Sequence, residues 1–119
     1  MKKRINSFKY AGKGVARVAA SETNFMIHLA AASAVTGLGF YFCISPAEWC
    51  LVLLCFGLVM SAEAMNSAVE RLVDFISPGH NEKAGEIKDI AAGAVLLSAV
   101  TAAAVGLIIF LPRVAARLQ

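Results

Sequence analysis

Charged residues are scarce in this sequence, and their scarcity excludes an ordinary water-soluble domain. Only 16% of the 119 residues are Asp, Glu, Lys or Arg, against roughly 25% in typical soluble domains. Hydrophobic residues make up 59% of the chain. A chain of this length has room for a single domain. We therefore predict one domain over residues 1–119, placed in a lipid bilayer.

Cysteine is also rare, and its pattern excludes a disulfide framework or a zinc site. Cys43, Cys50 and Cys55 lie in apolar stretches without a C-x-x-C pair or a histidine cluster. We therefore expect these cysteines to behave as small hydrophobic residues. Basic residues interleaved with aromatic ones, as a nucleic-acid surface requires, are missing too. We expect no nucleic-acid partner. The amino-terminal segment also lacks the pattern of a signal peptide.

Long apolar stretches are what the sequence does contain, and they predict an all-α membrane protein. About 20 apolar residues are enough for a helix to cross a bilayer. Stretches of this kind predict three transmembrane helices over residues of about 25–44, 47–76 and 90–111.

Local signals suggest where these spans begin and end. Ser45 and Glu48 favour a helix start for the second span, because such residues cap amino-terminal turns. Pro78-Gly79 predicts the end of this span and opens a polar loop over residues 77–86. Pro112 predicts the end of the third span.

The segment before the first span predicts an amphipathic helix on the membrane surface, over residues of about 4–20. Lys9, Lys13 and Arg17 recur every four residues and share one side of such a helix. Basic amphipathic helices bind anionic lipid surfaces. The alternative is a solvated basic arm.

Basic residues are distributed unevenly, and this predicts the orientation in the membrane. Six precede the first span and three more lie in or beside the polar middle, whereas two end the chain. The positive-inside rule then places the amino terminus and the polar middle in the cytosol. Because three spans form only a thin bundle rich in small residues, we also expect oligomerisation.

Polar residues at the cytosolic end of the second span fall on one face. At 100° per residue, the stripe contains Glu63, Asn66, Ser67, Glu70 and Asp74. Carboxylates inside a membrane are costly and mark functional sites by default. The alternative is a structural role, in which the stripe pairs with Lys or Arg on other helices.

Depth in the membrane suggests a different role for each carboxylate. Glu63 lies nearest the apolar interior and is the candidate general base, because burial makes a carboxylate a better proton acceptor. Glu70, nearer the cytosol, and Glu22 are candidate Mg²⁺ ligands.

Two residues at the start of the third span complete this set. Lys88 is a candidate phosphate ligand, and Asp89 is expected to orient Lys88 or a nucleotide. This arrangement suits phosphoryl transfer onto a membrane alcohol. His28 is a lone polar residue of the first span, and we expect it to form an interhelical hydrogen bond.

At these residues the chain resembles the bacterial membrane-integral diacylglycerol kinases, a family that includes undecaprenol kinases. The resemblance rests on E-x-x-N-S-A-V-E from Glu63 to Glu70, on Lys88-Asp89 before AAGAV, and on Glu22 before the first span. It covers nearly the whole chain. The segments SFKYAGKGV, ETNFMIH and GLIIFLP look more like the undecaprenol kinase branch.

The resemblance implies a homotrimer in the bacterial inner membrane, with active sites between subunits that use MgATP and a lipid alcohol. By position, Glu63 would be the general base, Asn66 would organise the site, and Glu22 and Glu70 would bind metal. Contacts to the nucleotide would come from Tyr10, Gly79, His80, Asn81, Lys88 and Asp89.

Two positions depart from the diacylglycerol branch, and they bear on the substrate. Gly12 stands where that branch tends to carry tryptophan, and Ser21 where it carries asparagine. From the segments that look like the undecaprenol kinase branch, undecaprenol is the first candidate substrate, and diacylglycerol is the alternative. A small proton-coupled transporter is an alternative of another class, and a pore-forming or scaffold protein is a third. A transporter predicts no cluster of polar partners at the cytosolic edge.

Overall fold

Four helices and no strands make up the computed structural model, which describes all residues from 1 to 119: α1 (Lys2–Ser21), α2 (Thr23–Phe42), α3 (Pro46–Ile76) and α4 (Glu82–Leu118). The prediction of an all-α protein is confirmed. Helices α2, α3 and α4 are each long and apolar enough to cross a membrane. At 31 residues, α3 is about 46 Å long, so it extends beyond the ~30 Å hydrocarbon core of a bilayer.

Side-chain caps explain why α3 begins where the sequence predicts. The backbone N–H of Glu48 donates to Ser45 Oγ at 3.2 Å, and the backbone N–H of Ser45 donates back to the Glu48 carboxylate at 2.9 Å. Pro46 occupies the first turn, where its missing N–H costs no helical hydrogen bond. The helix ends at Ile76, immediately before the Ser77-Pro78-Gly79 turn.

The prediction of a polar loop over residues 77–86 is wrong, because the loop between α3 and α4 covers only residues 77–81. Asn81 Oδ1 accepts hydrogen bonds from the backbone N–H groups of Lys83 and Ala84, at 2.9 and 3.2 Å. This cap lets α4 begin at Glu82. Lys88 and Asp89 therefore lie within a helix and not at its start.

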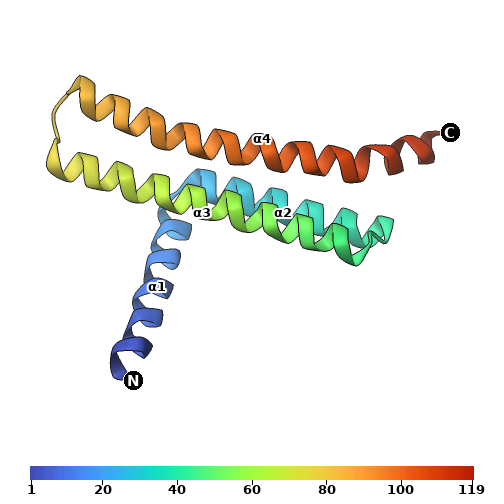
Figure 1. Ribbon diagram of the computed structural model, residues 1–119, viewed down its shortest axis with the longest axis horizontal. Coiled ribbons are helices and arrows are strands. Elements are labelled where there is room, and N and C mark those ends of the chain that lie inside the picture. The colour runs from blue at the N-terminus through green and yellow to red at the C-terminus, as the bar shows by residue number, and fades with distance from the viewer.

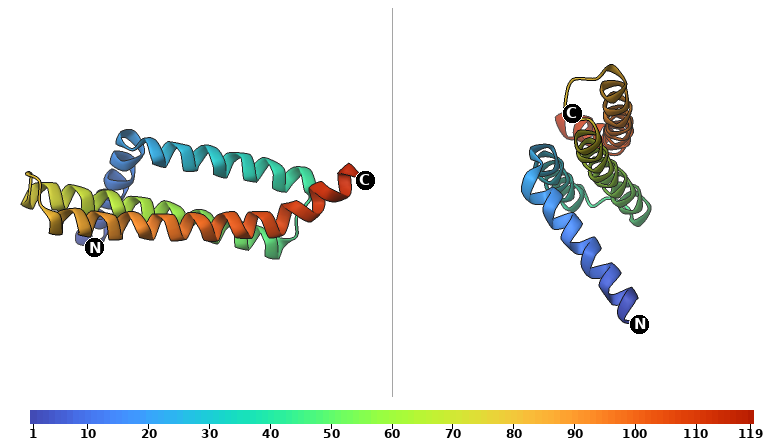
Figure 2. Two further views of the ribbon diagram at one scale, coloured as in Figure 1. Left: turned by 90° about the horizontal axis from the view of Figure 1, so that it is seen from above. Right: turned by 90° about the vertical axis from the view of Figure 1, so that its left-hand side faces the viewer.

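The prediction that Pro112 ends the last helix is wrong, because α4 continues through Pro112 to Leu118. Proline removes only its own N–H from the helical ladder and can remain in a helix that bends. The last turns of α4 bend away from its main axis in this region (Figure 2).

The three apolar helices run along a common direction, and α1 leaves them sideways (Figure 1). Helices α3 and α4 pack side by side, and α2 lies against α3. Glu22 separates α1 from α2 with an extended backbone, φ −107° and ψ 115°. This direction suits a helix on a membrane surface beside spans that cross it, although α1's contact with lipid remains a prediction.

A small apolar core closes the end of the bundle at the α2–α3 turn. Ile44, Ile109 and Phe110 are its buried members, and Trp49 packs against them. Gly39 is needed there, because an added Cβ would lie 2.6 Å from Cη2 of the Trp49 indole.

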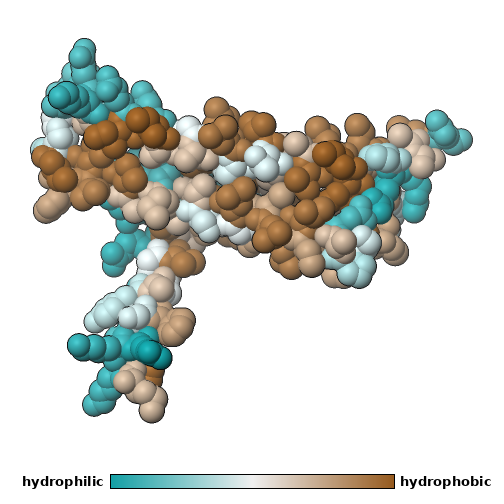
Figure 3. All heavy atoms as spheres, viewed as in Figure 1, coloured by the Kyte–Doolittle hydropathy of each residue, from teal (hydrophilic) through white to brown (hydrophobic).

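Most apolar side chains of the bundle point outward. Only 10 of the 119 residues are buried. The hydrophobic surface covers most of the bundle, whereas hydrophilic atoms gather at the α3–α4 loop, along α1 and at the end of the bundle near the carboxyl terminus (Figure 3). Such a surface needs lipid or further copies of the chain to cover it. Because either of these could cover the surface, the homotrimer remains a prediction.

Candidate active site

Glu63 and His28 form a polar contact between α3 and α2. Glu63 lies on α3 and is buried, with 4% of its surface exposed. His28 lies on α2, and its Nε2 is 3.1 Å from Glu63 Oε1. With Glu63 ionised, the ring N–H donates to the carboxylate. The interhelical hydrogen bond expected for His28 is present, and its partner is the candidate general base.

One turn along α3, a second set of contacts joins α3 to the junction between α1 and α2. Ser67 is buried and its Oγ donates to Glu22 Oε1 at 2.8 Å. Arg71 Nη2 donates to Ser21 Oγ at 2.7 Å and lies 4.0 Å from Glu22 Oε1. These contacts hold Glu22 beside the same face of α3 that carries Glu63.

Asn66 and Glu70 form a separate pair on α3. Asn66 Nδ2 donates to Glu70 Oε1 at 3.3 Å. The other amide atom, Asn66 Oδ1, is buried and has no hydrogen-bond partner. Asn66 also lines a small pocket between α3 and α4, of about 370 Å³. An unpaired buried acceptor is costly, and Asn66 Oδ1 is the one buried side-chain atom of this kind in the chain.

Lys88 of α4 is paired with Asp74 of α3 at the loop end of the bundle. The sequence predicted that Asp89 would orient either Lys88 or a nucleotide; the partner of Lys88 is Asp74, and a contact of Asp89 with a nucleotide stays a prediction. Asp89 is exposed on α4. Because α4 begins at Glu82 and packs along α3, Lys88 faces the end of the acidic stripe.

The predicted stripe is therefore divided between two flanks. Glu63 and Ser67 contact α2 and the α1–α2 junction, whereas Asp74 contacts α4. Asn66 and Glu70 contact each other. The helical arithmetic placed these residues on one side of α3, but it could not say which neighbouring helix each one meets.

The remaining predicted nucleotide ligands are not brought together within one chain. Tyr10 is exposed on α1, with Lys13 Nζ 5.7 Å from its ring centroid. Gly79 and His80 are exposed in the loop, and Asn81 caps α4. Helix α1 contacts α2 and α3 but not α4. Helix α1, which carries Tyr10, leaves the bundle on the side away from α4 (Figure 1).

The donor atoms present fit magnesium held together with a phosphate. Glu22 and Glu70 offer carboxylate oxygens from separate hydrogen-bond networks. No group of three or more His, Cys, Asp or Glu side chains that could hold a metal occurs in the chain. Mg²⁺ commonly takes one or two carboxylates, waters and substrate phosphates, so a complete cage of protein ligands is not required.

The partners of His28 and Ser67 were not predicted from the sequence. The pairing of His28 with Glu63 and the hydrogen bond from Ser67 to Glu22 both join residues far apart in the sequence. The available signals were that His28 is a lone polar residue in an apolar span and that Ser67 lies one turn from Glu63.

Comparison with known proteins gives the same family as the sequence motifs. The family model described as prokaryotic diacylglycerol kinase matches residues 9–110. An undecaprenol kinase of Bacillus subtilis is 43% identical over 109 residues, which are 92% of this chain and 89% of that protein.

Two further relatives carry the other name. A diacylglycerol kinase of Synechocystis is 37% identical over 89% of this chain and 61% of its own length. One of Haemophilus influenzae is 33% identical over 79% of this chain and 80% of its own length. The chain thus belongs to the prokaryotic diacylglycerol kinase family and is a membrane lipid kinase.

Proposed function

We propose that this protein transfers the γ-phosphate of ATP to the hydroxyl of a membrane lipid alcohol, with undecaprenol as the first candidate and diacylglycerol as the second. The observation that carries this proposal is the buried carboxylate of Glu63, held by His28 beside the network of Ser67 and Glu22. The similarity to the Bacillus subtilis undecaprenol kinase supports the choice of substrate.

Glu63 would take the proton of the lipid hydroxyl as its oxygen forms a bond to the γ-phosphorus. The bond between that phosphorus and the bridging oxygen of ADP breaks, and the products are a lipid monophosphate and ADP. Such transfers depend on positioning and charge neutralisation more than on covalent chemistry. His28 holds one oxygen of Glu63 and so fixes the direction in which the other one points.

Glu22 and Glu70 would hold Mg²⁺, which neutralises phosphate charge when bound. Asn66 has a free buried oxygen beside Glu70 and would help organise the site. Lys88, Asp89, Tyr10 and the loop residues Gly79, His80 and Asn81 would contact the nucleotide. Since Tyr10 and Lys88 lie on helices that do not touch in one chain, we infer that a complete site takes residues from at least two copies, in keeping with a homotrimer.

The active site would face the cytosol of a bacterium, where ATP is available, and the spans would lie in the inner membrane. The basic residues of α1 and of the α3–α4 loop end support this orientation. The polar contacts of Glu22, Glu70 and Lys88 at that same end do not favour a transporter, and the family of the chain is one of kinases.

The direct test compares the two lipid alcohols in parallel. Purified protein in detergent micelles is given γ-labelled ATP, magnesium, and either undecaprenol or diacylglycerol at matched mole fractions. We expect label in the lipid fraction with a higher kcat/KM for undecaprenol. A higher kcat/KM for diacylglycerol would reverse the substrate assignment, and no labelled lipid from either would refute the proposed function.

A further inference from the structure

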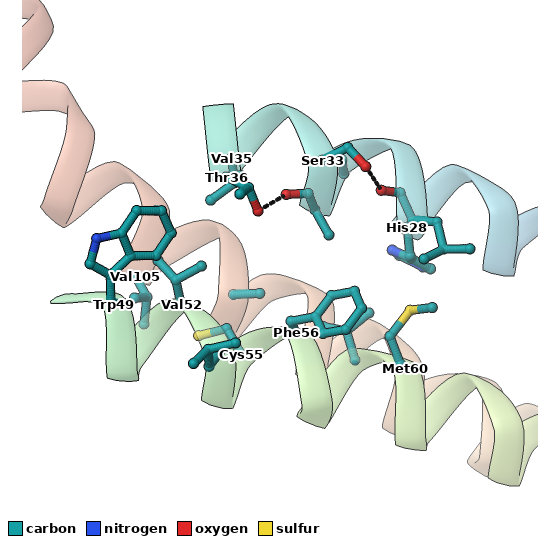
Figure 4. A pocket seen from close by; sticks show the side chains of 17 residues that line it. His28, Ser33, Val35, Thr36, Trp49, Val52, Cys55, Phe56, Met60 and Val105 are labelled. Carbon is teal, nitrogen blue, oxygen red and sulfur yellow. Dashed lines mark hydrogen bonds between the residues drawn. The ribbon is translucent and has the colours of Figure 1, made fainter. Parts of the chain in front are cut away.

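The junction between α1 and α2 consists of the single residue Glu22, and few polar contacts fix it relative to α3. An apolar pocket of about 690 Å³ lies between α2 and α3 (Figure 4). Two hydroxyls line this pocket, but Ser33 and Thr36 each donate to a carbonyl of their own helix. The one side-chain hydrogen bond between α2 and α3 is that of His28 to Glu63. The direction of the Glu22 side chain therefore depends on the contacts at the junction itself.

Two side chains of α3 reach this junction. Ser67 Oγ donates to Glu22 Oε1 at 2.8 Å. Arg71 Nη2 donates at 2.7 Å to the hydroxyl of Ser21, the last residue of α1. Since Ser67 and Arg71 lie four residues apart, they share one side of α3. Helix α3 therefore holds both Glu22 and the residue before it.

Both groups of α3 approach the same oxygen of Glu22. Ser67 bonds Oε1, and Arg71 Nη2 lies 4.0 Å from Oε1. Glu22 Oε2 has no hydrogen bond within the chain, and the side chain is 30% exposed. A carboxylate held by one oxygen presents the other in a defined direction. Groups that hydrogen-bond a metal-binding side chain orient it for the ion in this way.

The guanidinium of Arg71 contacts Ser21 more closely than Glu22. Its Nη2 is 2.7 Å from the Ser21 hydroxyl but 4.0 Å from the carboxylate, which is beyond hydrogen-bond distance. The Arg71 side chain is also 46% exposed, and exposed ion pairs contribute little. The chief effect of Arg71 is therefore to hold Ser21, and not to neutralise Glu22.

We propose that Arg71 is a positioning residue of the metal site, which acts through its hydrogen bond to Ser21 and fixes the direction of the Glu22 carboxylate. The inference rests on the proposed function, in which Glu22 is a ligand of Mg²⁺, and adds the residue that holds this ligand. Because Glu22 alone separates two helices, holding Ser21 also limits where the backbone of Glu22 can lie. Ser67 then fixes one oxygen of its side chain.

The charge of Arg71 allows the sign of the effect to test the inference. A guanidinium this close to a metal ligand repels a divalent cation, so its removal alone would make the cation bind more tightly. Loss of positioning has the opposite effect and makes the cation bind less tightly. Ser21→Ala removes the same hydrogen bond without changing the charge, and so it isolates the positioning effect.

The experiment measures the binding of Mn²⁺, in place of Mg²⁺, together with a non-hydrolysable ATP analogue. Purified protein in detergent, without a lipid alcohol, is titrated with Mn²⁺, and the free ion is followed by electron paramagnetic resonance. We expect Ser21→Ala to raise the Kd of Mn²⁺ by about tenfold, as loss of an orienting partner does. Arg71→Met should raise the Kd by a smaller factor, because the repulsion is lost as well. The double variant should match Arg71→Met, since one bond can be lost only once.

Two further variants and a second assay complete the test. Arg71→Lys keeps a donor and should recover part of the affinity. Arg4→Met removes the same charge from an exposed site of α1 and should bind Mn²⁺ as the wild type does. In the kinase assay, Ser21→Ala and Arg71→Met should lose activity at low magnesium and regain it at high magnesium, with the KM for undecaprenol unchanged. A purely structural defect would not be corrected by magnesium.

The outcomes separate this inference from the proposed function. A wild type that binds Mn²⁺ but phosphorylates no lipid alcohol would refute the proposed function, whereas the Kd values decide the positioning role. Kd values equal to that of Arg4→Met, a lower Kd in Arg71→Met, or no recovery of activity at high magnesium would overturn the inference alone. If Arg71→Met raises the Kd and Ser21→Ala does not, Arg71 contacts the phosphate directly and the inference is wrong.

Discussion

At the scale of single residues, the proposed chemistry depends on a buried carboxylate that keeps a hydrogen bond. Burying a charge is costly unless other groups bond to it, and Glu63 has His28 as such a partner. The next residues toward the cytosol are also paired, Ser67 with Glu22 and Asn66 with Glu70. The amide oxygen of Asn66 is the one buried side-chain oxygen or nitrogen without a partner.

Replacing Glu63 by glutamine tests its role as the base. The amide keeps the size of the side chain and can still bond His28, but it cannot take a proton. We expect kcat for lipid phosphorylation to fall by about 10²- to 10⁴-fold, while nucleotide binding measured by calorimetry is kept. Loss of nucleotide binding together with turnover would contradict the assignment.

His28 is expected to act by positioning Glu63, and two substitutions separate this from a purely steric role. His28→Gln keeps an N–H donor, whereas His28→Leu keeps bulk and removes the donor. We expect His28→Leu to lower kcat by about tenfold or more, because hydrogen bonds to charged groups contribute about 1.5–3 kcal/mol. His28→Gln should recover much of that loss, with the KM for ATP unchanged in both. Equal kcat values in the two variants would show that the hydrogen bond does not matter.

The sequence predicts those parts of the site that depend on residues near one another in the chain, and it does not predict contacts between distant residues. Glu63, Asn66 and Glu70 share one helix, so their common side follows from the 100° step of a helix. The hydrogen bond between His28 and Glu63 joins residues 35 positions apart. It depends on the position of α2 along α3, which the sequence alone does not give. Lys88 pairs with Asp74 and not with Asp89 because α4 already begins at Glu82. The polar residues after Glu82 made this segment look like a loop, so the sequence did not predict that start.

At the scale of elements, one ion pair and one hydrogen bond join the helices at the end of the bundle far from the site. Arg113 of α4 donates from Nη2 to Glu48 Oε1 at 2.7 Å and from Nη1 to Glu48 Oε2 at 2.8 Å. Arg117 of α4 donates to the Tyr41 hydroxyl of α2. The capping signal of Glu48 could be read from the sequence, but its partner Arg113 could not, because Pro112 suggested that the helix had ended.

Glu48→Gln should weaken the contact between α3 and α4 at this end and still allow α3 to begin at Pro46. Glutamine can still close the capping box with Ser45, but it cannot form the charged, two-pronged pair with Arg113. We expect a melting temperature in detergent that is lower by a few degrees and a kcat at low temperature that is unchanged. Glu86→Gln, at an exposed site of α4, is the matched control. Equal melting temperatures for the two variants would show that the pair contributes nothing to stability.

At the scale of the whole molecule, the two halves of the proposed nucleotide site do not meet within one chain. Tyr10 lies on α1, and Lys88 lies on α4, with which α1 makes no contact. The largely outward-facing apolar surface shows that the chain has area to share with further copies as well as with lipid. A site built from two copies would join these halves.

Mixing of inactive subunits tests this arrangement. We expect Tyr10→Ala and Lys88→Ala proteins each to lose most kinase activity at a fixed, subsaturating ATP concentration. When the two are unfolded together and reconstituted, some sites take Tyr10 from one chain and Lys88 from the other, so activity should return. Mixing Tyr10→Ala with the double variant Tyr10→Ala/Lys88→Ala is the control and should stay inactive, because every chain lacks Tyr10. Failure of the first mixture at all ratios would mean that both residues serve a site within one chain, which the separation of α1 from α4 makes difficult to build.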